Sequence, residues 1–267
     1  MSLPKPYYQD GAVTLYHGDN VEVMREMESE SVDLVVTSPP YDNLRVYGGH
    51  GWNFADVAQE LTRLLKPGGV IVWVVADATI DGSETGTSFR QALHFMDVCG
   101  LHLHDTMIYR KTNPVPLTHN RYEQAWEYMF VFSSGRPKTW NPIMVSCDTF
   151  GNKKYRGGAK QNEDSYAERR RHEWTSTAEK KQATNIFDYC VGDNEKTEHN
   201  APFPVKLASD HIQSWSNPGD TVLDPFAGSG TTLRAAKDLG RLAIGTEIEA
   251  RYVEIIARRM GQEVLAL

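Results

Sequence analysis

The sequence predicts an α/β fold, with a mostly parallel sheet and helices on both faces. Short runs rich in Val, Ile and Leu alternate with segments of helical periodicity, as in parallel β-α-β units. Two of these runs end in loops with unusual residue patterns, after Thr37 and at Asp224, and ligands of such folds bind at the carboxyl ends of strands. The alternation is interrupted once, from Gly135 to about Asp193, which predicts an insertion.

In the first half of the chain, the run Val32–Thr37 predicts a strand that stops at a Pro-Pro loop. Asn53 can cap a helix with one apolar stripe from Phe54 to Leu65, and Pro67-Gly68-Gly69 should end that helix. The elements expected next are a buried strand Val70–Val75, a helix Ser88–Cys99, and strands Leu101–Tyr109 and Glu127–Phe132.

Beyond Gly135 the periodicity fades, and only Ala167–Trp174 has the composition of a helix. Order resumes with a helix Lys206–Trp215, a strand Thr221–Asp224, a helix Thr231–Leu239, a strand Leu242–Thr246 and a helix Ala250–Arg259. We therefore divide the chain into a first part of the main domain (1–135), an insertion (136–197) and a second part of the main domain (198–267).

Composition places the chain among ordinary globular proteins. Of its 267 residues, 40% are hydrophobic and 24% charged, which is typical of a water-soluble protein. The first ten residues lack the apolar core of a signal peptide, and the longest apolar run, Val70–Ala76, is too short to cross a bilayer. We expect a cytoplasmic protein. Cys99, Cys147 and Cys190 are widely spaced, which favours reduced thiols over a disulfide or a zinc site.

Charge is distributed unevenly. The net charge is −7, yet residues 136–182 hold 11 Lys and Arg against 6 Asp and Glu, while the remainder holds 17 against 29. A basic insertion on an acidic body suits a segment that follows a nucleic-acid backbone, and a solvated loop would have the same composition. Charge alone does not decide between a nucleic-acid contact and a solvated loop. The candidate phosphate contacts are Lys153, Lys154, Arg156, Arg169, Arg170 and Arg171.

A glycine-rich loop, Asp224-Pro-Phe-Ala-Gly-Ser-Gly-Thr-Thr232, joins a predicted strand to a predicted helix. Gly228 and Gly230 allow a tight turn and a close approach to a ligand. The loop lacks the Lys-Ser/Thr ending of a phosphate-binding loop and the third glycine of a dinucleotide fingerprint. Asp224 would repel a pyrophosphate, but it would suit the α-amino group of a methionine moiety.

Glu247 ends the next predicted strand, 17 residues after Gly230. A carboxylate there can accept hydrogen bonds from both ribose hydroxyls. The ligand predicted by Asp224 and Glu247 together is cationic at one end and carries a ribose. S-adenosylmethionine meets this description and NAD does not. The alternative is an ordinary strand-to-helix turn, but it would leave unexplained why the loop, Asp224 and Glu247 agree in spacing.

A second motif, Ser38-Pro39-Pro40-Tyr41, follows the strand Val32–Thr37. The prolines restrict the backbone, so the Ser38 hydroxyl and the Pro39 carbonyl can both accept the N–H bonds of one amino group. Tyr41 offers a ring on which a flipped base can stack. A tight turn without function is the alternative for this motif taken alone.

These residues suit methyl transfer to an exocyclic amino group. Hydrogen bonds to Ser38 and Pro39 would offset the charge that develops on the nitrogen, and alignment with the sulfonium methyl supplies much of the remaining acceleration. Methylation of a cytosine carbon would need a cysteine nucleophile, and none of the three cysteines follows a proline or lies in a site-like segment.

Together the two motifs resemble the amino-group DNA methyltransferases, specifically the permuted β-type branch, in which the catalytic tetrapeptide precedes the cofactor loop. The resemblance covers residues 14–135 and 198–260, and it implies the S-adenosylmethionine-dependent methyltransferase fold with the insertion as target-recognition region. It implies double-stranded DNA as substrate, a family tendency to dimerise, and restriction-modification as the setting, with or without a cognate endonuclease.

The resemblance also implies roles for single residues. Asp19, in Tyr16-His-Gly-Asp-Asn20, matches a residue that contacts the cofactor adenine. The stretch His199–Leu207, with Phe203 and Lys206, is similar to one that packs on the methionine end of the cofactor. The segments Arg110–Pro114 and Glu127–Phe132 resemble the lining of the base pocket. The cofactor loop of the family is matched by Asp224, Pro225, Phe226, Gly228, Gly230 and Thr231, and its ribose-binding acid by Glu247.

One departure concerns the base. Many adenine-modifying members carry Asp where this chain has Ser38, and the Ser form is frequent among cytosine enzymes although it also occurs in adenine enzymes. We lean towards cytosine N4 over adenine N6. Two rivals remain open: an RNA or protein amino-group methyltransferase, which usually has the cofactor loop first, and a DNA-binding module without activity.

Overall fold

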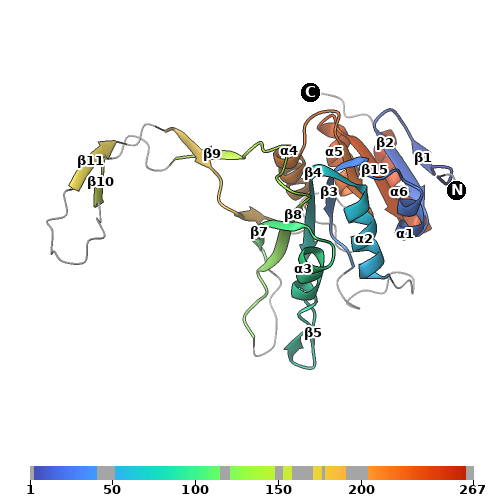
Figure 1. Ribbon diagram of the computed structural model, residues 1–267, viewed down its shortest axis with the longest axis horizontal. Coiled ribbons are helices and arrows are strands. Elements are labelled where there is room, and N and C mark those ends of the chain that lie inside the picture. Colours follow the sequence, from blue (N-terminus) through green and yellow to red (C-terminus); the bar gives the residue numbers. More distant parts are fainter. Residues whose placement is uncertain are drawn as a thin grey trace. The chain divides into compact units, whose positions relative to one another are not determined.

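The computed structural model describes residues 3–40, 52–114, 121–147, 153–157, 171–175, 178–190 and 204–262. The chain forms two compact units, one of Met1–Asn141 with Asn185–Leu267 and the other of Pro142–Thr184. The larger unit contains a mixed, mostly parallel sheet covered by helices (Figure 1), so the predicted α/β class is confirmed. No helix in the described ranges is long and apolar enough to cross a membrane.

Nine strands form the sheet of the larger unit, in the order β1-β2-β15-β14-β3-β4-β8-β7-β13. From β2 to β4 every neighbouring pair is parallel, and β8 is antiparallel to both of its neighbours. The strands are β1 (Tyr8–Gln9), β2 (Val13–His17), β3 (Val32–Thr37), β4 (Leu65–Val75), β7 (His102–Lys111), β8 (Trp126–Ser133), β13 (Ile186–Tyr189), β14 (Thr221–Asp224) and β15 (Leu242–Glu247). A separate hairpin joins β5 (Thr79–Ile80) to β6 (Ser83–Glu84).

Helices cover both faces of this sheet, because side chains alternate between the faces along each strand. On β4, Val70, Val72 and Val74 join one buried cluster, while Ile71 and Trp73 join the other. The first cluster contains the helices α4 (Val205–Trp215), α5 (Thr231–Asp238) and α6 (Ala250–Gly261), and the second contains α1 (Asn20–Arg25), α2 (Phe54–Leu64) and α3 (Thr87–Asp97).

Most predicted elements are present with small changes at their ends. Asn53 caps α2, as predicted, by accepting a hydrogen bond from the backbone N–H of Ala55 at 3.0 Å. The strand expected from Val70 begins at Leu65 instead, directly after α2. The register between β3 and β4 shifts after Val32, and this irregularity lets Pro67 and the two glycines lie inside the strand.

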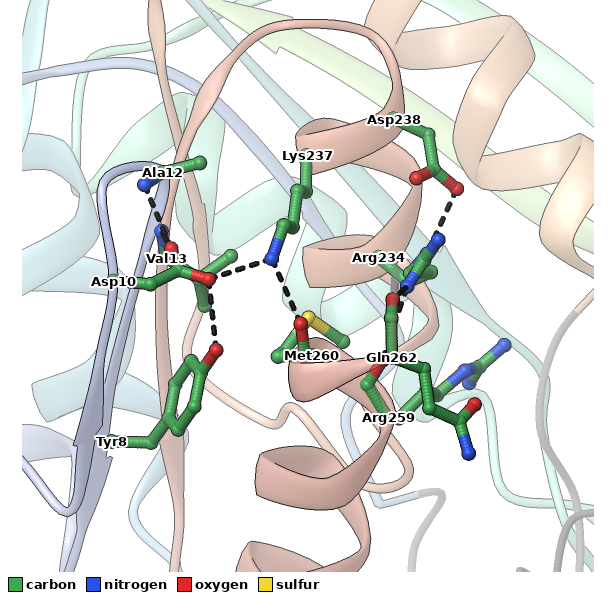
Figure 2. A network of polar contacts seen from close by, with 10 residues as sticks. All are labelled: Tyr8, Asp10, Ala12, Val13, Arg234, Lys237, Asp238, Arg259, Met260 and Gln262. Carbon is green, nitrogen blue, oxygen red and sulfur yellow. Dashed lines mark hydrogen bonds and ion pairs between the residues drawn. The ribbon is translucent and has the colours of Figure 1, made fainter. Parts of the chain in front are cut away.

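Two side chains of α5 bind the backbone at the end of α6, and one of them, Lys237, also binds Asp10 near β1 (Figure 2). The Lys237 ammonium donates to the Met260 carbonyl at 2.8 Å and to the Asp10 carboxylate at 2.6 Å. Arg234 donates to the carbonyl of Arg259 at 3.1 Å. Cations at this position stabilise the negative end of a helix. Burial acts to raise the pKa of Asp10, but hydrogen bonds from Lys237 and the backbone outweigh it and hold that pKa well below its usual range.

The smaller unit consists of short antiparallel pairs. β9 (Met144–Ser146) pairs with β12 (Lys180–Gln182), and β10 (Lys153–Gly157) pairs with β11 (Arg171–Thr175). The helix predicted over Ala167–Trp174 is therefore wrong where the structure describes it, because Arg171 to Trp174 form part of β11. Residues 167–170 lie outside the described ranges.

Candidate functional site

The candidate site lies along one edge of the sheet, where five neighbouring parallel strands end. β2, β15, β14, β3 and β4 run in the same direction and follow one another in the sheet. The residues at or just beyond four of these ends are Asp19, Glu247, Asp224 and Ser38. Residues from the two ends of the sequence are thus brought to one edge, as the sequence interpretation requires.

A side-chain hydrogen bond joins the two motifs directly. The Thr37 hydroxyl, at the end of β3, donates to the Asp224 carboxylate, at the end of β14, over 2.7 Å. Thr37 is fully buried and Asp224 is 1% exposed. A second link runs from the Thr232 hydroxyl to the Val36 carbonyl at 3.2 Å. The tetrapeptide and the glycine-rich loop are therefore held in fixed register by bonds across 187 and 196 positions of sequence.

Asp224 is a buried carboxyl group whose hydrogen-bond partners are the protein's own groups. Besides Thr37, the backbone N–H of Phe226 donates to it at 3.1 Å. Burial raises the pKa of Asp224, while the hydrogen bonds from Thr37 and from the backbone of Phe226 act in the opposite direction. The carboxylate thereby organises the loop, and its contact with a methionine amino group stays a prediction.

The glycine-rich loop has the backbone that its sequence predicts. Gly228 has φ +53° and Gly230 has φ +81°, in the left-handed region where a side chain is disfavoured. A Cβ on Gly230 would also lie 3.1 Å from the side chain of Ile256 in α6. Gly230 therefore serves the close packing of α5 and α6, while the N–H of Gly228 donates to the Glu247 carboxylate at 2.7 Å.

Glu247, at the end of β15, is a nearly buried acid with a raised pKa. It is 8% exposed, and burial raises its pKa to about 7 in spite of hydrogen bonds from the backbone N–H groups of Glu249 and Gly228. The negative charge of Asp224 raises this pKa further. A nearly buried carboxyl group that is ready to ionise near neutrality suits a ligand that brings hydroxyl donors to it.

Two further residues at this edge were missed from the sequence. Oε1 of Glu249 is buried, and no described group donates a hydrogen bond to it, so a ligand donor would satisfy it. The Asn20 amide donates to the Pro225 carbonyl at 3.1 Å and fixes the glycine-rich loop against α1. The signal for Glu249 was its position two residues after Glu247, at the same strand end, whereas nothing in the sequence pointed to Asn20.

Asp19 lies at the end of β2 and caps α1. Its Oδ1 accepts hydrogen bonds from the backbone N–H groups of Val21 at 2.8 Å and Glu22 at 3.1 Å. The neighbouring Gly18 N–H donates to the Glu247 carbonyl at 3.0 Å, which places Asp19 beside the end of β15. Its contact with an adenine ring stays a prediction.

The remaining predicted residues are distributed as follows. Ser38 and Pro40 are half-buried and Pro39 is buried, while Tyr41 and Phe203 lie outside the described ranges. The Phe226 ring packs edge-on against Trp52, with ring centroids 5.0 Å apart. Pro225 is buried and supplies the carbonyl bound by Asn20, and Thr231 is the first residue of α5.

Lys206 is held in a network of its own, at the start of α4. Its ammonium lies 2.8 Å and 2.7 Å from the two carboxylate oxygens of Asp210, and the Tyr189 hydroxyl donates to the same carboxylate at 2.9 Å. The backbone carbonyl of Tyr189 in turn accepts from the N–H of Thr112, just after β7. The network joins β13, β7 and α4, and a contact between Lys206 and a cofactor stays a prediction.

The predicted phosphate contacts fall in the smaller unit. Lys153, Lys154 and Arg156 belong to β10 and Arg171 to β11, while Arg169 and Arg170 lie outside the described ranges. Lys154 pairs in register with Trp174, and Arg156 with His172. These basic residues therefore stand on a two-stranded antiparallel ribbon.

Replacing Thr37 with Val should lower the free energy of unfolding by about 2 kcal/mol, because a buried carboxylate loses a donor. Urea denaturation measures the change. Thr246→Val is the matched control: its buried hydroxyl donates to the Pro225 carbonyl at 2.8 Å, and loss of a bond to a neutral acceptor should cost about 1 kcal/mol. Equal losses in the two variants would mean that the Thr37–Asp224 bond contributes no more than a bond to a neutral group.

Comparison with known proteins identifies the family of the chain. The family model described as DNA methylase, for N6 and N4 methyltransferases, matches residues 32–258. The orphan methyltransferase M.BamHII of Bacillus amyloliquefaciens is 47% identical over 88% of this chain and 91% of its own length. The type II methyltransferase M.BglII of Bacillus subtilis is 27% identical over 98% of this chain and 72% of its own length.

Solved structures show the same fold. The PvuII DNA methyltransferase, described as cytosine-N4-specific, superposes with a TM-score of 0.73 at 23% identity, over 98% of this chain and 91% of that one. A protein of Thermus thermophilus, TTHA0409, described as a DNA modification methylase in complex with S-adenosyl-L-methionine, has a TM-score of 0.61 at 26% identity, over 95% and 96%.

The fold and the family match define an α/β enzyme of the methyltransferase class. The chain belongs to the N6/N4 DNA methylase family, and it is a DNA methyltransferase.

Proposed function

We propose that this protein transfers a methyl group from S-adenosylmethionine to the N4 amino group of a cytosine flipped out of double-stranded DNA. The observation that carries the proposal is the Thr37–Asp224 hydrogen bond, because it holds the base-binding motif and the cofactor loop at one edge. Adenine N6 is the alternative acceptor. Ser38 favours cytosine, since the Ser form of the tetrapeptide is frequent among enzymes that act on the cytosine amino group, although it also occurs in adenine enzymes.

The residues of the edge fit S-adenosylmethionine. The buried Glu247 carboxyl group can accept the ribose hydroxyls, and the unsatisfied Oε1 of Glu249 can accept one further donor of the same ligand. Asp224 ends β14 at the same edge, and its carboxyl group can interact with the cationic end of that ligand. When bound, S-adenosylmethionine supplies an electrophilic methyl group on a sulfonium sulfur.

On the base side, the Ser38 hydroxyl and the Pro39 carbonyl accept the two N–H bonds of the target amino group. These bonds draw the nitrogen towards tetrahedral geometry and stabilise the positive charge that develops on it. Tyr41 stacks on the flipped ring. The surplus proton leaves after transfer, so no strong general base is needed at this edge.

Tritium transfer tests the proposal. Unmethylated duplex DNA is incubated with the protein and methyl-labelled S-adenosylmethionine, digested to nucleosides and separated, with tRNA and rRNA as parallel substrates. We expect label in N4-methylcytosine. Label in N6-methyladenine would overturn the choice of base, and label in RNA alone would overturn the choice of substrate. Binding of cofactor and DNA without any transfer would overturn the proposed activity. Sequencing of DNA from expressing cells gives the recognition sequence.

We further propose that the β10–β11 ribbon binds DNA, since a two-stranded ribbon fits the major groove. Replacing Lys153, Lys154 and Arg156 together with Gln should weaken DNA binding and reduce the salt dependence of log K by roughly 2 to 3, at about 0.9 per lost phosphate contact. Binding is measured by fluorescence anisotropy over a range of salt concentrations. The control replaces Lys5, Arg25 and Arg258, which are exposed in the larger unit. Equal slopes in the two triple variants would exclude the ribbon from the phosphate contacts.

A further inference from the structure

Trp52 is an aromatic residue outside both sequence motifs that lies at the edge of the sheet holding the candidate site. It comes directly before Asn53, the residue that caps α2. β3 and β4 are parallel neighbours, so the connection through α2 has to begin at the carboxyl end of β3 and return to the start of β4. Trp52 therefore lies at the same edge as Ser38, which follows β3.

The Trp52 ring contacts the glycine-rich loop. It packs edge-on against Phe226, with ring centroids 5.0 Å apart and an angle of 71° between the ring planes. Phe226 is the second residue after Asp224, and its backbone N–H donates to the Asp224 carboxylate at 3.1 Å. Trp52 thus meets the loop next to the carboxyl group that can interact with the cationic end of S-adenosylmethionine.

Other neighbours of Trp52 belong to the core. Its ring centroid lies 6.1 Å from that of Phe54 in α2 and 6.3 Å from that of Trp73 in β4. Trp73 is fully buried, and its indole N–H donates to the Gln91 side chain at 2.9 Å. These contacts hold the Trp52 ring before any ligand binds, so a ligand would not have to order it.

The surroundings of the Trp52 ring favour a positive charge. Trp52 is half-buried, and because an edge-on pair covers at most one face of each ring, Phe226 leaves a face of the indole uncovered. The face of an aromatic ring has a negative potential that attracts cations, and indole attracts them most strongly. The carboxyl groups of Asp19, Asp224 and Glu247 stand at the same edge.

Methyl transfer changes the charge of the cofactor at one atom. The sulfonium sulfur of S-adenosylmethionine is positive, whereas the thioether sulfur of the product, S-adenosylhomocysteine, is neutral. The adenine, the ribose and the amino-acid end are the same in both molecules. Contacts to those shared parts bind donor and product alike, while an aromatic face beside the sulfur binds the donor more tightly.

We propose that the indole of Trp52 binds the sulfonium group of S-adenosylmethionine by a cation–π interaction and thereby selects the methyl donor over the neutral product. Trp52 is then a specificity-determining residue for the cofactor. This role requires that S-adenosylmethionine binds at this edge, as in the proposed function, but it is independent of the base that is methylated. Such selection favours exchange of the product for a new donor after each transfer.

Titration calorimetry on the full-length protein measures this selection, with S-adenosylmethionine, S-adenosylhomocysteine and sinefungin as ligands. Sinefungin carries an ammonium group on carbon in place of the methylated sulfonium. Trp52→Leu should raise the dissociation constants of the two cationic ligands by about fivefold or more, and that of S-adenosylhomocysteine by no more than about twofold. Trp52→Phe keeps a ring with a weaker face and should give an intermediate result.

Phe54→Leu is the matched control for lost packing. Phe54 belongs to the same aromatic cluster and packs against Trp52 and, towards α3, against His94 and Phe95. Its replacement should disturb the surroundings of Trp52, yet the ratio of the constants for donor and product should stay within about twofold of the original value. Thermal unfolding shows whether each variant is folded.

Fluorinated tryptophan gives a test that leaves the shape of the ring nearly unchanged, because fluorine weakens the negative potential of the indole face. Its incorporation replaces all six tryptophans, so Trp52→Phe protein labelled in the same way is the control. The preference for donor over product should fall in the original sequence and stay unchanged in that control. This measurement decides the question even if Trp52→Leu does not fold.

The possible failures can be told apart. Equal losses of affinity for donor and product in Trp52→Leu would overturn the cation–π role, and so would a preference that fluorination does not change. Either result would leave the cofactor site itself intact. If the original protein bound no S-adenosylmethionine at all, both this role and the proposed function would be overturned.

Discussion

Ser38→Ala is expected to reduce kcat by about 100-fold, the loss typical of removing one preorganised polar group that stabilises developing charge. The Ser38 hydroxyl is one of two acceptors proposed for the target amino group, and the Pro39 carbonyl alone would leave one N–H bond without a partner. Ser38 follows β3 directly and does not belong to the cofactor loop, so the dissociation constant of S-adenosylmethionine should stay within about twofold.

Single-turnover kinetics on an unmethylated duplex measures the rate of methyl transfer, and titration calorimetry measures the cofactor affinity separately. Ser83→Ala, at an exposed serine of β6, is the control and should leave kcat unchanged. Ser38→Asp returns an acceptor to the position and should retain more activity than Ser38→Ala. If the Ser38→Ala protein kept its full kcat, the Ser38 hydroxyl would have no part in the mechanism.

Glu247→Ala should raise the dissociation constant of S-adenosylmethionine by about 100-fold, because two hydrogen bonds to a charged acceptor, at about 1.5 kcal/mol each, are lost. Titration calorimetry measures the constant. Glu254→Ala removes an exposed acid from α6 and serves as control. Since Glu247 also accepts the N–H groups of Gly228 and Glu249, thermal unfolding of the free protein must show that the variant remains folded.

The pH dependence of S-adenosylmethionine affinity is a second test of Glu247 as the ribose-binding acid. Burial raises the pKa of Glu247 to about 7, so the free protein carries a proton there below that pH, and the neutral acid is the weaker acceptor. The dissociation constant should therefore rise by up to tenfold per pH unit as the pH falls below about 7, and it should level off above it. Glu247→Gln cannot titrate and should lose this dependence. A constant that is equal at about pH 6 and about pH 8 in the original protein would contradict the assignment.

The main features of the site could be predicted because they depend on local backbone requirements. The glycines of the Asp224 loop and the strand ends at Thr37 and Glu247 can each be recognised from a few neighbouring residues. Parallel strands then bring their carboxyl ends to one edge. The Thr37–Asp224 bond could not be predicted, because it depends on which strands are neighbours and on their register. β2 and α1 escaped detection for a related reason, since five and six residues carry too little periodicity.

The helix predicted over Ala167–Trp174 was wrong because the structure there depends on a distant part of the chain. Ala167–Trp174 has Ala, Glu and Arg in a composition that favours a helix, yet Arg171–Thr175 form β11. The backbone hydrogen bonds of β11 are supplied by β10, from Lys153 to Gly157, and such pairing overrides intrinsic preference. A prediction from one segment could not include a partner that lies elsewhere in the sequence.

The hydrogen bonds from Lys237 to Asp10 and to the Met260 carbonyl have a consequence for the order of the elements along the chain. The segment before β2 and the end of α6 are held by one side chain, so a chain joined there and opened between β13 and α4 would keep every neighbour in the sheet. Proteins accept such circular permutation where the joined ends are close together. In the rearranged order the glycine-rich loop would precede the tetrapeptide Ser38–Tyr41, which is the order usual in the RNA and protein enzymes considered above as rivals. The two orders would then share one order of strands in the sheet and differ only in where the chain begins.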